Sequence, residues 1–351
     1  MSRNARDYDY ALPAELIAQY PAPQRDESRL MVLDGDAAVH RSFRDLPPLL
    51  RPDDLLVLNE TRVIAARLIG KREPGGGACE LLLLHPAGSM RYDADAVRWI
   101  ALTRPARRLR RGARVLFEPF GDALVCEELE EGMREIEFRL TLPFATFLDR
   151  GGRMPLPPYI HNDSPQAQDR YQSVFARLPG SVAAPTASLH FTSRLLAAIE
   201  ARGIEIVRLT LDIGLGTFCP VTVESIDEHV MHEEAYAIGA EAAATLERAR
   251  TLGRRIVAAG TTVVRALEGN YASFGRIESG NHVTGIFITP GFRFRVVDAM
   301  ITNFHLPRST LLMLVSAFGG RERLLRAYAE AIERRYRFYS FGDAMFLTRS
   351  A

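Results

Sequence analysis

Hydrophobic and polar positions follow two different periods along the chain, and the change between them divides it into two kinds of structure. Residues 296–301 are mostly apolar and rich in β-branched side chains, as in a strand buried on both faces. The apolar run 310–318 predicts a helix with Ser309 as its N-cap. Strand-like and helix-like segments also alternate over residues 7–58 and 192–268. We therefore expect an α/β domain with a Rossmann-like, mostly parallel sheet.

Residues 66–150 differ from the rest because apolar and polar side chains alternate there with a period of two. Turn residues such as those at 74–77 and 121–122 separate the short strands, and no helical stretch lies between them. This spacing is typical of a small antiparallel barrel. We expect residues 66–150 to form an inserted β-barrel domain, and residues 1–65 and 151–351 to form the α/β domain that binds substrate.

The composition argues against a membrane-spanning, secreted or disulfide-rich protein but does not indicate a particular function. The 351 residues carry a net charge of +1, and the apolar runs fall far short of the roughly 20 residues that a membrane span needs. The N-terminus is too polar for a signal peptide, so we expect a cytoplasmic protein. Three widely spaced cysteines argue against a disulfide framework and a thiolate zinc site. His229 and His232 have no third ligand at a suitable spacing, and no metal is expected.

Positive charge is concentrated in two short stretches of the sequence. Six arginines lie within residues 104–114, and three more lie at the end of the last predicted helix and in the aromatic tail that follows it. Such clusters suit RNA phosphates, although a solvated loop and a tail docked on the core explain them equally well. The residues that we predict to contact RNA are Arg104, Arg107, Arg108, Arg110, Arg111, Arg334, Arg335 and Arg337.

Polar and glycine-containing loops follow several predicted strands, at the end where open α/β sheets bind ligands. Small residues there let a ligand approach backbone N–H groups, and a helix start favours a carboxylate or phosphate. A purely structural role for each loop is the alternative. The candidate substrate-binding residues are Asn59, Thr61, Arg62, Pro185, Thr186, Gly214, Gly216, Thr217, Gly260, Thr261, Thr262, Arg265, Asn303, Arg308 and Ser309. No GxSxG, HExxH or P-loop motif is present, so these loops favour binding a nucleotide-like molecule and transferring part of it.

Several strings resemble the S-adenosylmethionine:tRNA ribosyltransferase-isomerase family of queuosine biosynthesis. They are NETRVIAARL, MPLPPYI, RYQSVFA, PTASLHF, LDIGLGTF, GTTVVRALE, TNFHLPRSTLLMLVSAF and YRFYSFGDAMF. The resemblance runs nearly end to end, and its TNFHLPRST and GTTxxRALE motifs are specific. It implies an α/β domain with an inserted β-barrel.

The resemblance also implies an activity. Members transfer and isomerise the ribosyl part of S-adenosylmethionine onto 7-aminomethyl-7-deazaguanine at the tRNA wobble position, giving epoxyqueuosine-tRNA, adenine and methionine. S-adenosylmethionine is then a consumed substrate, tRNA is the partner, no cofactor is needed, and we expect a monomer without membrane association. The alternatives are a catalytically silent tRNA-binding protein of the same fold and an ordinary methyltransferase.

Four positions depart from the family pattern. Ser188 replaces a glycine, Glu60 an aspartate, Asp212 a histidine and Val263 a serine. The changes at 212 and 263 remove an imidazole and a hydroxyl, which counts against essential catalytic roles at those two positions. A member with altered activity is the other explanation.

The family reaction, as usually drawn, removes a proton beside the sulfonium and assists the departure of adenine. Imidazole titrates near neutrality, with an ordinary pKa of about 6.5, so it suits either role. His190 and His305 lie in the motifs that carry the resemblance, although a histidine beside phenylalanines is often only a core residue. Asp343 and Glu60 are the carboxylate alternatives for the catalytic group.

Overall fold

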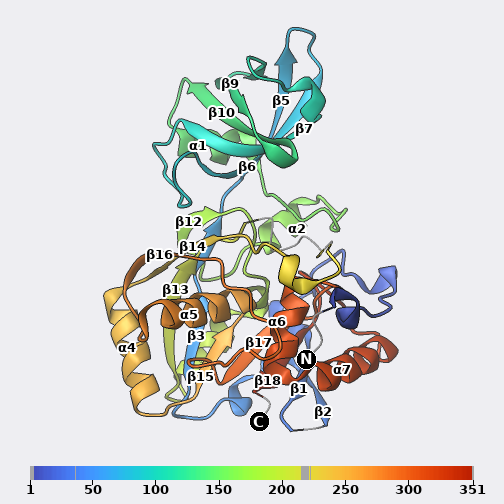
Figure 1. Ribbon diagram of the computed structural model, residues 1–351, viewed down its shortest axis with the longest axis vertical. Coiled ribbons are helices and arrows are strands. Elements are labelled where there is room, and N and C mark those ends of the chain that lie inside the picture. The colour runs from blue at the N-terminus through green and yellow to red at the C-terminus, as the bar shows by residue number, and fades with distance from the viewer. Residues whose placement is uncertain (1–3, 36, 215–220, 222, 350–351) are drawn as a thin grey trace. The chain divides into compact units, whose positions relative to one another are not determined.

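The computed structural model describes residues 4–35, 37–214, 221 and 223–349 (Figure 1). Its contacts divide the chain into two compact units. An α/β unit contains Met1–Thr61, Pro157–Arg177 and Ala184–Ala351, and a barrel unit contains Arg62–Leu156 and Leu178–Ala183. The domain limits expected from the sequence stay a prediction.

The described part of the α/β unit contains a nine-stranded sheet in the order β16-β14-β13-β3-β15-β17-β18-β1-β2. The central strands β13, β3, β15 and β17 are parallel neighbours, as predicted, whereas antiparallel pairs toward both edges make the whole sheet mixed. The strands are β1 (Arg29–Leu33), β2 (Ala38–Ser42), β3 (Leu55–Asn59), β13 (Glu205–Leu211), β14 (Glu234–Ile238), β15 (Ile256–Ala259), β16 (Gly280–Thr284), β17 (Ala299–Asn303) and β18 (Ala344–Thr348).

Helices cover the central strands, which are buried along their whole length in β3, β15 and β17. α5 packs on β3, β13, β15 and β17 (Figure 1). Side chains on alternate positions of these strands join Phe191 and Leu195 in one continuous core. The helices of this unit are α2 (Pro165–Arg170), α3 (Ser193–Glu200), α4 (Ala240–Thr251), α5 (Thr261–Phe274), α6 (Thr310–Gly319) and α7 (Arg321–Glu333). None of the described helices has both the length and the apolar character of a membrane span.

The segment around β17 and α6 shows where the local pattern succeeds and where it fails. The predicted helix is confirmed, and Ser309 Oγ accepts a hydrogen bond from the Leu312 N–H at 3.2 Å as its N-cap. The predicted strand at 296–301 is instead Ala299–Asn303. The N–H groups of Val296 and Val297 donate to the buried Glu268 carboxylate at 3.0 and 2.9 Å, so they do not pair with a strand.

The barrel unit confirms the predicted antiparallel barrel. Within the described residues six strands pair in the order β5-β6-β7-β10-β9-β8, and β8 closes the ring on β5. Gly70 lies at this closure, where a Cβ atom would come within 2.4 Å of Val115 Cγ1. The strands are β5 (Arg67–Glu73), β6 (Ala78–Pro86), β7 (Arg98–Arg104), β8 (Arg114–Phe117), β9 (Gly121–Glu128) and β10 (Met133–Leu140), and helix α1 spans Phe144–Gly151.

Short elements complete the chain. β11 (Gly152–Arg153) pairs with β5, and β4 (Thr61–Val63) and β12 (Leu178–Ser181) form a two-stranded sheet. The 3₁₀ helices are η1 (Ala5–Tyr8), η2 (Ala14–Leu16), η3 (Arg25–Glu27), η4 (Phe43–Asp45), η5 (Pro47–Leu49), η6 (Ala106–Arg108), η7 (Glu130–Gly132), η8 (Thr186–His190) and η10 (Ile226–Glu228).

Candidate active site

A cavity in the α/β unit lies at the carboxyl ends of three parallel strands. Ile213 follows β13, Gly260 follows β15, and Thr302 belongs to the last residues of β17; all three line the cavity. It contains about 350 Å³ of space, part of it open to solvent. Open α/β sheets bind their ligands at this edge. Six of the predicted residues meet here: Pro185, Thr186, Gly260, Thr261, Thr262 and His305.

The N-terminus of α5 supplies hydrogen-bond donors to the cavity. Gly260 is the N-cap and has a φ of 105°, a value that an L side chain rarely adopts. It provides no side-chain cap, so the first N–H groups of α5 have no intrahelical partner and carry partial positive charge. Thr262 Oγ1 is also buried and has no hydrogen-bond partner among the described residues. These donors suit an oxygen-bearing, negatively polarised part of a ligand.

His305 lines the same cavity and is held in place through its backbone. Its N–H donates to the Tyr328 hydroxyl at 2.9 Å, and the Tyr10 hydroxyl donates to its carbonyl oxygen. Its Nε2 lies 2.8 Å from Thr302 Oγ1. Burial lowers the pKa of His305 to about 3, so the imidazole is neutral near pH 7. A neutral imidazole can accept a proton but is a poor proton donor.

His190 is outside this cavity and both of its ring nitrogens have partners. Nδ1 lies 2.7 Å from Ser28 Oγ, and Nε2 lies 3.1 Å from Asn303 Nδ2, which also donates to the Tyr339 carbonyl at 3.1 Å. Because an amide nitrogen only donates, Nε2 accepts and Nδ1 carries the proton. Burial, followed by the charges of Arg337 and Arg25, lowers the pKa of His190 to about 3. This geometry suits a structural imidazole.

Both carboxylate candidates are buried and bound to arginines. Asp343 accepts from the Arg29 N–H at 2.9 Å and from the Arg337 N–H at 2.8 Å, which holds the C-terminal turn. Glu60 Oε1 lies 2.6 Å from Arg177 Nη2. Neither carboxylate is among the described residues that line the cavity at α5.

The predicted residues after β3 mostly contact the protein itself. The Asn59 amide donates to the Leu211 carbonyl at 3.0 Å and accepts from the Leu211 N–H at 3.1 Å, which joins β3 to β13. Thr61 Oγ1 donates to Asp212 Oδ1 at 3.0 Å, so one of the departures from the family pattern has an internal partner. Arg62 is exposed on the barrel unit. Asn59 and Thr61 therefore orient the loop rather than present free polar groups.

The other predicted binding residues are dispersed. Arg265 is buried against Glu234, away from the lining of the cavity. Arg308 has a φ of 55°, and its Nε is buried without a partner among the described residues. Ser309 is occupied as the cap of α6. Gly214 is half-buried, while Gly216 and Thr217 lie outside the described residues.

The predicted tRNA-binding arginines differ in their surroundings. The barrel supplies Arg104, Arg107, Arg108, Arg110 and Arg111. All five are exposed, and no carboxylate of the described chain forms an ion pair with them. In the α/β unit, Arg334 pairs with Glu330 at 2.9 Å and Arg335 is exposed. Unpaired exposed guanidinium groups on the barrel suit a phosphate backbone.

Sequence reasoning missed part of the cavity lining. Ile213 lies within the LDIGLGTF string, but an apolar residue beside a strand end cannot be distinguished from a core residue by pattern. Thr302 lies next to the end of the predicted strand, and Leu311 lies near the start of the predicted helix. A structural role in those elements explains both residues, so the sequence gives no separate signal for a binding role. Among the described residues, no three His, Cys, Asp or Glu side chains are placed to hold a metal ion.

The fold is that of an α/β protein with an inserted antiparallel barrel, and its cavity lies at the edge where open α/β sheets bind ligands. The model of the family described as "Queuosine biosynthesis protein" matches residues 5–347. The chain therefore belongs to the queuosine biosynthesis protein family.

Named relatives are similar in sequence to this chain over nearly its whole length. The chain is 52% identical over 347 residues to the S-adenosylmethionine:tRNA ribosyltransferase-isomerase of Symbiobacterium thermophilum, covering 97% of this chain and 98% of the relative. It is 50% identical to the protein of that name from Gloeobacter violaceus, covering 98% and 96%. The crystal structure of S-adenosylmethionine tRNA ribosyltransferase from Thermotoga maritima is similar with a TM-score of 0.54 and 36% identity, covering 97% of this chain and 99% of that one.

Proposed function

We propose that this chain transfers and isomerises the ribosyl moiety of S-adenosylmethionine onto 7-aminomethyl-7-deazaguanine at the tRNA wobble position. The products are epoxyqueuosine-tRNA, adenine and methionine, and S-adenosylmethionine is consumed as a substrate. The observation that carries this proposal is the full-length identity of about half to ribosyltransferase-isomerases. A catalytically silent tRNA-binding protein is not favoured, because the cavity keeps a cluster of unoccupied donors.

The cavity at α5 is where we place part of S-adenosylmethionine. That molecule carries ribose hydroxyls and a carboxylate, and the N-terminus of α5 with Thr262 Oγ1 supplies donors for such oxygens. Gly260 lets the ligand approach the backbone because no side chain covers the first turn. Among the four titratable candidates, only His305 lines this cavity in the described chain.

We assign the role of proton acceptor to His305. Its neutral imidazole at pH 7 is the form that can take a proton from the carbon beside the sulfonium. A pKa of about 3 is far below the value that is ideal for a base at neutral pH. We therefore expect a contribution of about 10²-fold, the lower end of the usual range for acid–base groups.

The exposed arginines of the barrel are proposed to contact the tRNA backbone. The support is that, within the described residues, no carboxylate forms an ion pair with their guanidinium groups. Phosphate contacts of this kind position an RNA without reading its bases, and they make its affinity dependent on salt.

One incubation tests the reaction. The purified protein, mixed with S-adenosylmethionine and tRNA that carries the aminomethyl base, should release adenine and methionine in equal amounts. A silent binding protein would shift the mobility of the tRNA and release neither product. A methyltransferase would release S-adenosylhomocysteine instead, so either result contradicts the proposal.

A pair of threonine variants tests the position of the substrate. Thr262→Ala removes the unpaired hydroxyl of the cavity, while Thr251→Ala removes an exposed hydroxyl on α4 that donates to the Glu247 carbonyl at 2.8 Å. One lost hydrogen bond of about 0.5–1.5 kcal/mol should raise the KM for S-adenosylmethionine roughly 2- to 12-fold in the first variant. The second variant should leave KM unchanged. If both variants have the same KM for S-adenosylmethionine, the substrate does not bind in this cavity.

A further inference from the structure

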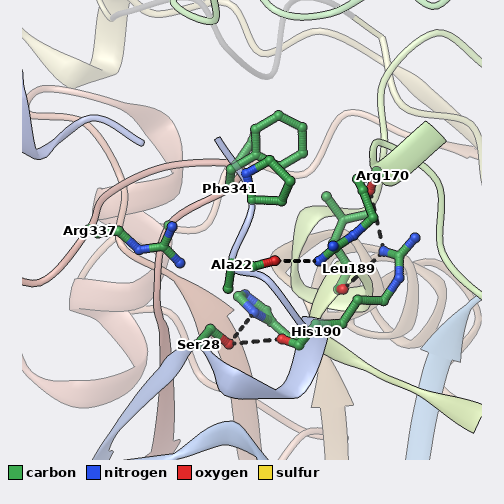
Figure 2. A pocket seen from close by; sticks show the side chains of 11 residues that line it. Ala22, Ser28, Arg170, Leu189, His190, Arg337 and Phe341 are labelled. Carbon is green, nitrogen blue, oxygen red and sulfur yellow. Dashed lines mark hydrogen bonds between the residues drawn. The ribbon is translucent and has the colours of Figure 1, made fainter. Parts of the chain in front are cut away.

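A second cavity of the α/β unit is lined by three arginines from distant parts of the sequence. Arg25 belongs to η3, Arg170 ends α2, and Arg337 precedes β18. Figure 2 shows Arg170 and Arg337 reaching toward the cavity from opposite sides, with His190 and Ser28 along another edge. Of these three arginines, only Arg337 is among the tRNA-binding residues predicted from the sequence.

Positive charge in this cavity is poorly compensated. Arg25 Nη1 donates to the carbonyls of Arg170 and Leu189 at 3.3 and 3.1 Å. Arg170 donates to the carbonyls of Ala22 and Pro23 at 2.9 and 3.1 Å. All four acceptors are neutral backbone oxygens, so they fix the two side chains without balancing their charge.

No acidic side chain of the described chain lines the cavity. The carboxylate nearest to Arg25 along the sequence belongs to Asp26, and its Oδ2 lies 3.3 Å from Arg194 Nη2. Arg337 Nη2 lies 3.7 Å from Asp343, whose carboxylate also binds Arg29 at 3.0 Å. One carboxylate is thus shared between two arginines, and the guanidinium groups of the cavity retain an excess of positive charge.

Burial of these positive charges lowers the pKa of two of the arginines. Burial, and next the charge of Arg170, lower the pKa of Arg25 to about 10. Burial also lowers the pKa of Arg170, and its Nε is buried without a partner among the described residues. Guanidinium groups stay protonated at neutral pH, so an anion in the cavity would relieve the repulsion between the two side chains.

The chemistry of the lining selects among anions. The amino-acid end of a ligand carries an ammonium beside its carboxylate, and no acidic residue among the described ones lines this cavity to receive that ammonium. A phosphodiester carries only negative charge, and guanidinium groups bind its oxygens in a fork geometry. The cavity contains about 260 Å³ of space, part of it open to solvent.

We propose that Arg25, Arg170 and Arg337 form a subsite for a single phosphate group of the tRNA backbone. The identity of the nucleic acid rests on the proposed function, whereas the preference for a phosphate rests on the cavity. The three guanidinium groups share one phosphate, so they act as one contact and not as three. The proposal can be tested because each phosphate contact releases counterions from the tRNA, and the salt dependence of the affinity reports how many are released.

The first test compares Arg25→Gln/Arg170→Gln with Arg248→Gln. Arg248 lies on α4 with 57% of its side chain exposed and serves as the matched control. In titrations with tRNA at increasing salt, the double variant should lose about one unit from the slope of log affinity against log salt, and its affinity should fall roughly tenfold. The control should match the wild type. A loss of two units would mean that each arginine binds its own phosphate and would overturn the shared subsite.

A second variant keeps all three arginines and remains informative if the double variant does not fold. Ala22 lines the cavity beside Arg170, so Ala22→Asp would place a carboxylate where the phosphate is expected (Figure 2). We expect Tm to rise, because the carboxylate balances the arginines, while tRNA affinity and salt slope fall as in the double variant. A purely structural role predicts no loss of tRNA affinity.

The source of the phosphate is tested with inorganic phosphate alone. Millimolar phosphate, compared with chloride at equal ionic strength, should raise the Tm of the wild type and not that of Ala22→Asp. A rise in Tm without any change in the tRNA salt slope of the variants would indicate a site for free small anions and contradict the proposal. Release of adenine by the wild type is measured separately, so failure of the subsite and failure of the proposed function are distinguishable.

Discussion

Replacing Arg265 by alanine will show whether this side chain supports the fold or the substrate. Its place in the GTTVVRALE motif predicts substrate binding. In the structure it is 2% exposed, and its Nη1 forms an ion pair with Glu234. Its other nitrogens donate to the carbonyls of His232 at 3.2 Å and Ile286 at 3.3 Å. All three contacts link α5 to the segments around β14 and β16.

The expected loss follows from the burial of both charges. Removing one partner leaves the other charge unpaired in the interior, which costs about 3–5 kcal/mol. For a unit of this size, about 2–4 °C of Tm corresponds to each kcal/mol, so Arg265→Ala should lower Tm by roughly 6–20 °C. Arg265→Met combined with Glu234→Gln removes both charges and should recover most of that loss.

Thermal unfolding followed by circular dichroism measures this effect. Arg248→Ala is the control, because Arg248 and Glu205 form an exposed pair at 3.7 Å, and such pairs contribute about 1 kcal/mol or less. The structural reasoning would be refuted if Arg265→Ala kept the wild-type Tm while the KM for S-adenosylmethionine rose more than about tenfold, since one lost charged hydrogen bond to substrate has that effect. In that case Arg265 binds substrate, as the motif predicts.

Three further predictions concern the buried histidines and the barrel. His190 and His305 have pKa values of about 3 when folded, against about 6.5 when unfolded, so their contribution to stability is complete above pH 6.5 and is lost between pH 6.5 and 3. Each buried histidine should lower the free energy of unfolding by roughly 1.4 kcal/mol for every pH unit in that window. The urea midpoint of His190→Asn should therefore depend less on pH than that of the wild type, and an equal dependence would contradict this. His305→Asn should retain binding of both substrates while turnover falls about 10²-fold; unchanged turnover would leave the carboxylates as candidates. Replacing Arg104, Arg107, Arg108 and Arg110 by glutamine should reduce the tRNA salt slope by up to about 0.9 for each lost contact, and an unchanged slope would identify the loop as solvated surface.

Local signals were sufficient to predict the elements that frame the cavity. The glycine after β15 and the cap at Ser309 depend on conformations within a few residues, and both lie where the pattern places them. The period-two segment likewise predicts the barrel, because each strand pairs mostly with neighbours in sequence. The assignment of Val296 and Val297 to a strand is wrong, because their N–H groups bind the Glu268 carboxylate of helix α5, which is distant in the sequence.

Side-chain roles were harder to predict than elements, because they depend on partners far away in the sequence. A polar residue at a strand end looks available for substrate until its partner is known: Asn59 binds Leu211 across the sheet, and Arg265 binds Glu234. The same limit applies to charge. A search for neighbouring arginines in the sequence finds 104–114, but it cannot find a cavity whose guanidinium groups come from residues 25, 170 and 337. Only the fold brings those three charges together in a cavity where no described residue contributes a carboxylate, and this imbalance, more than the number of arginines, indicates an anionic ligand.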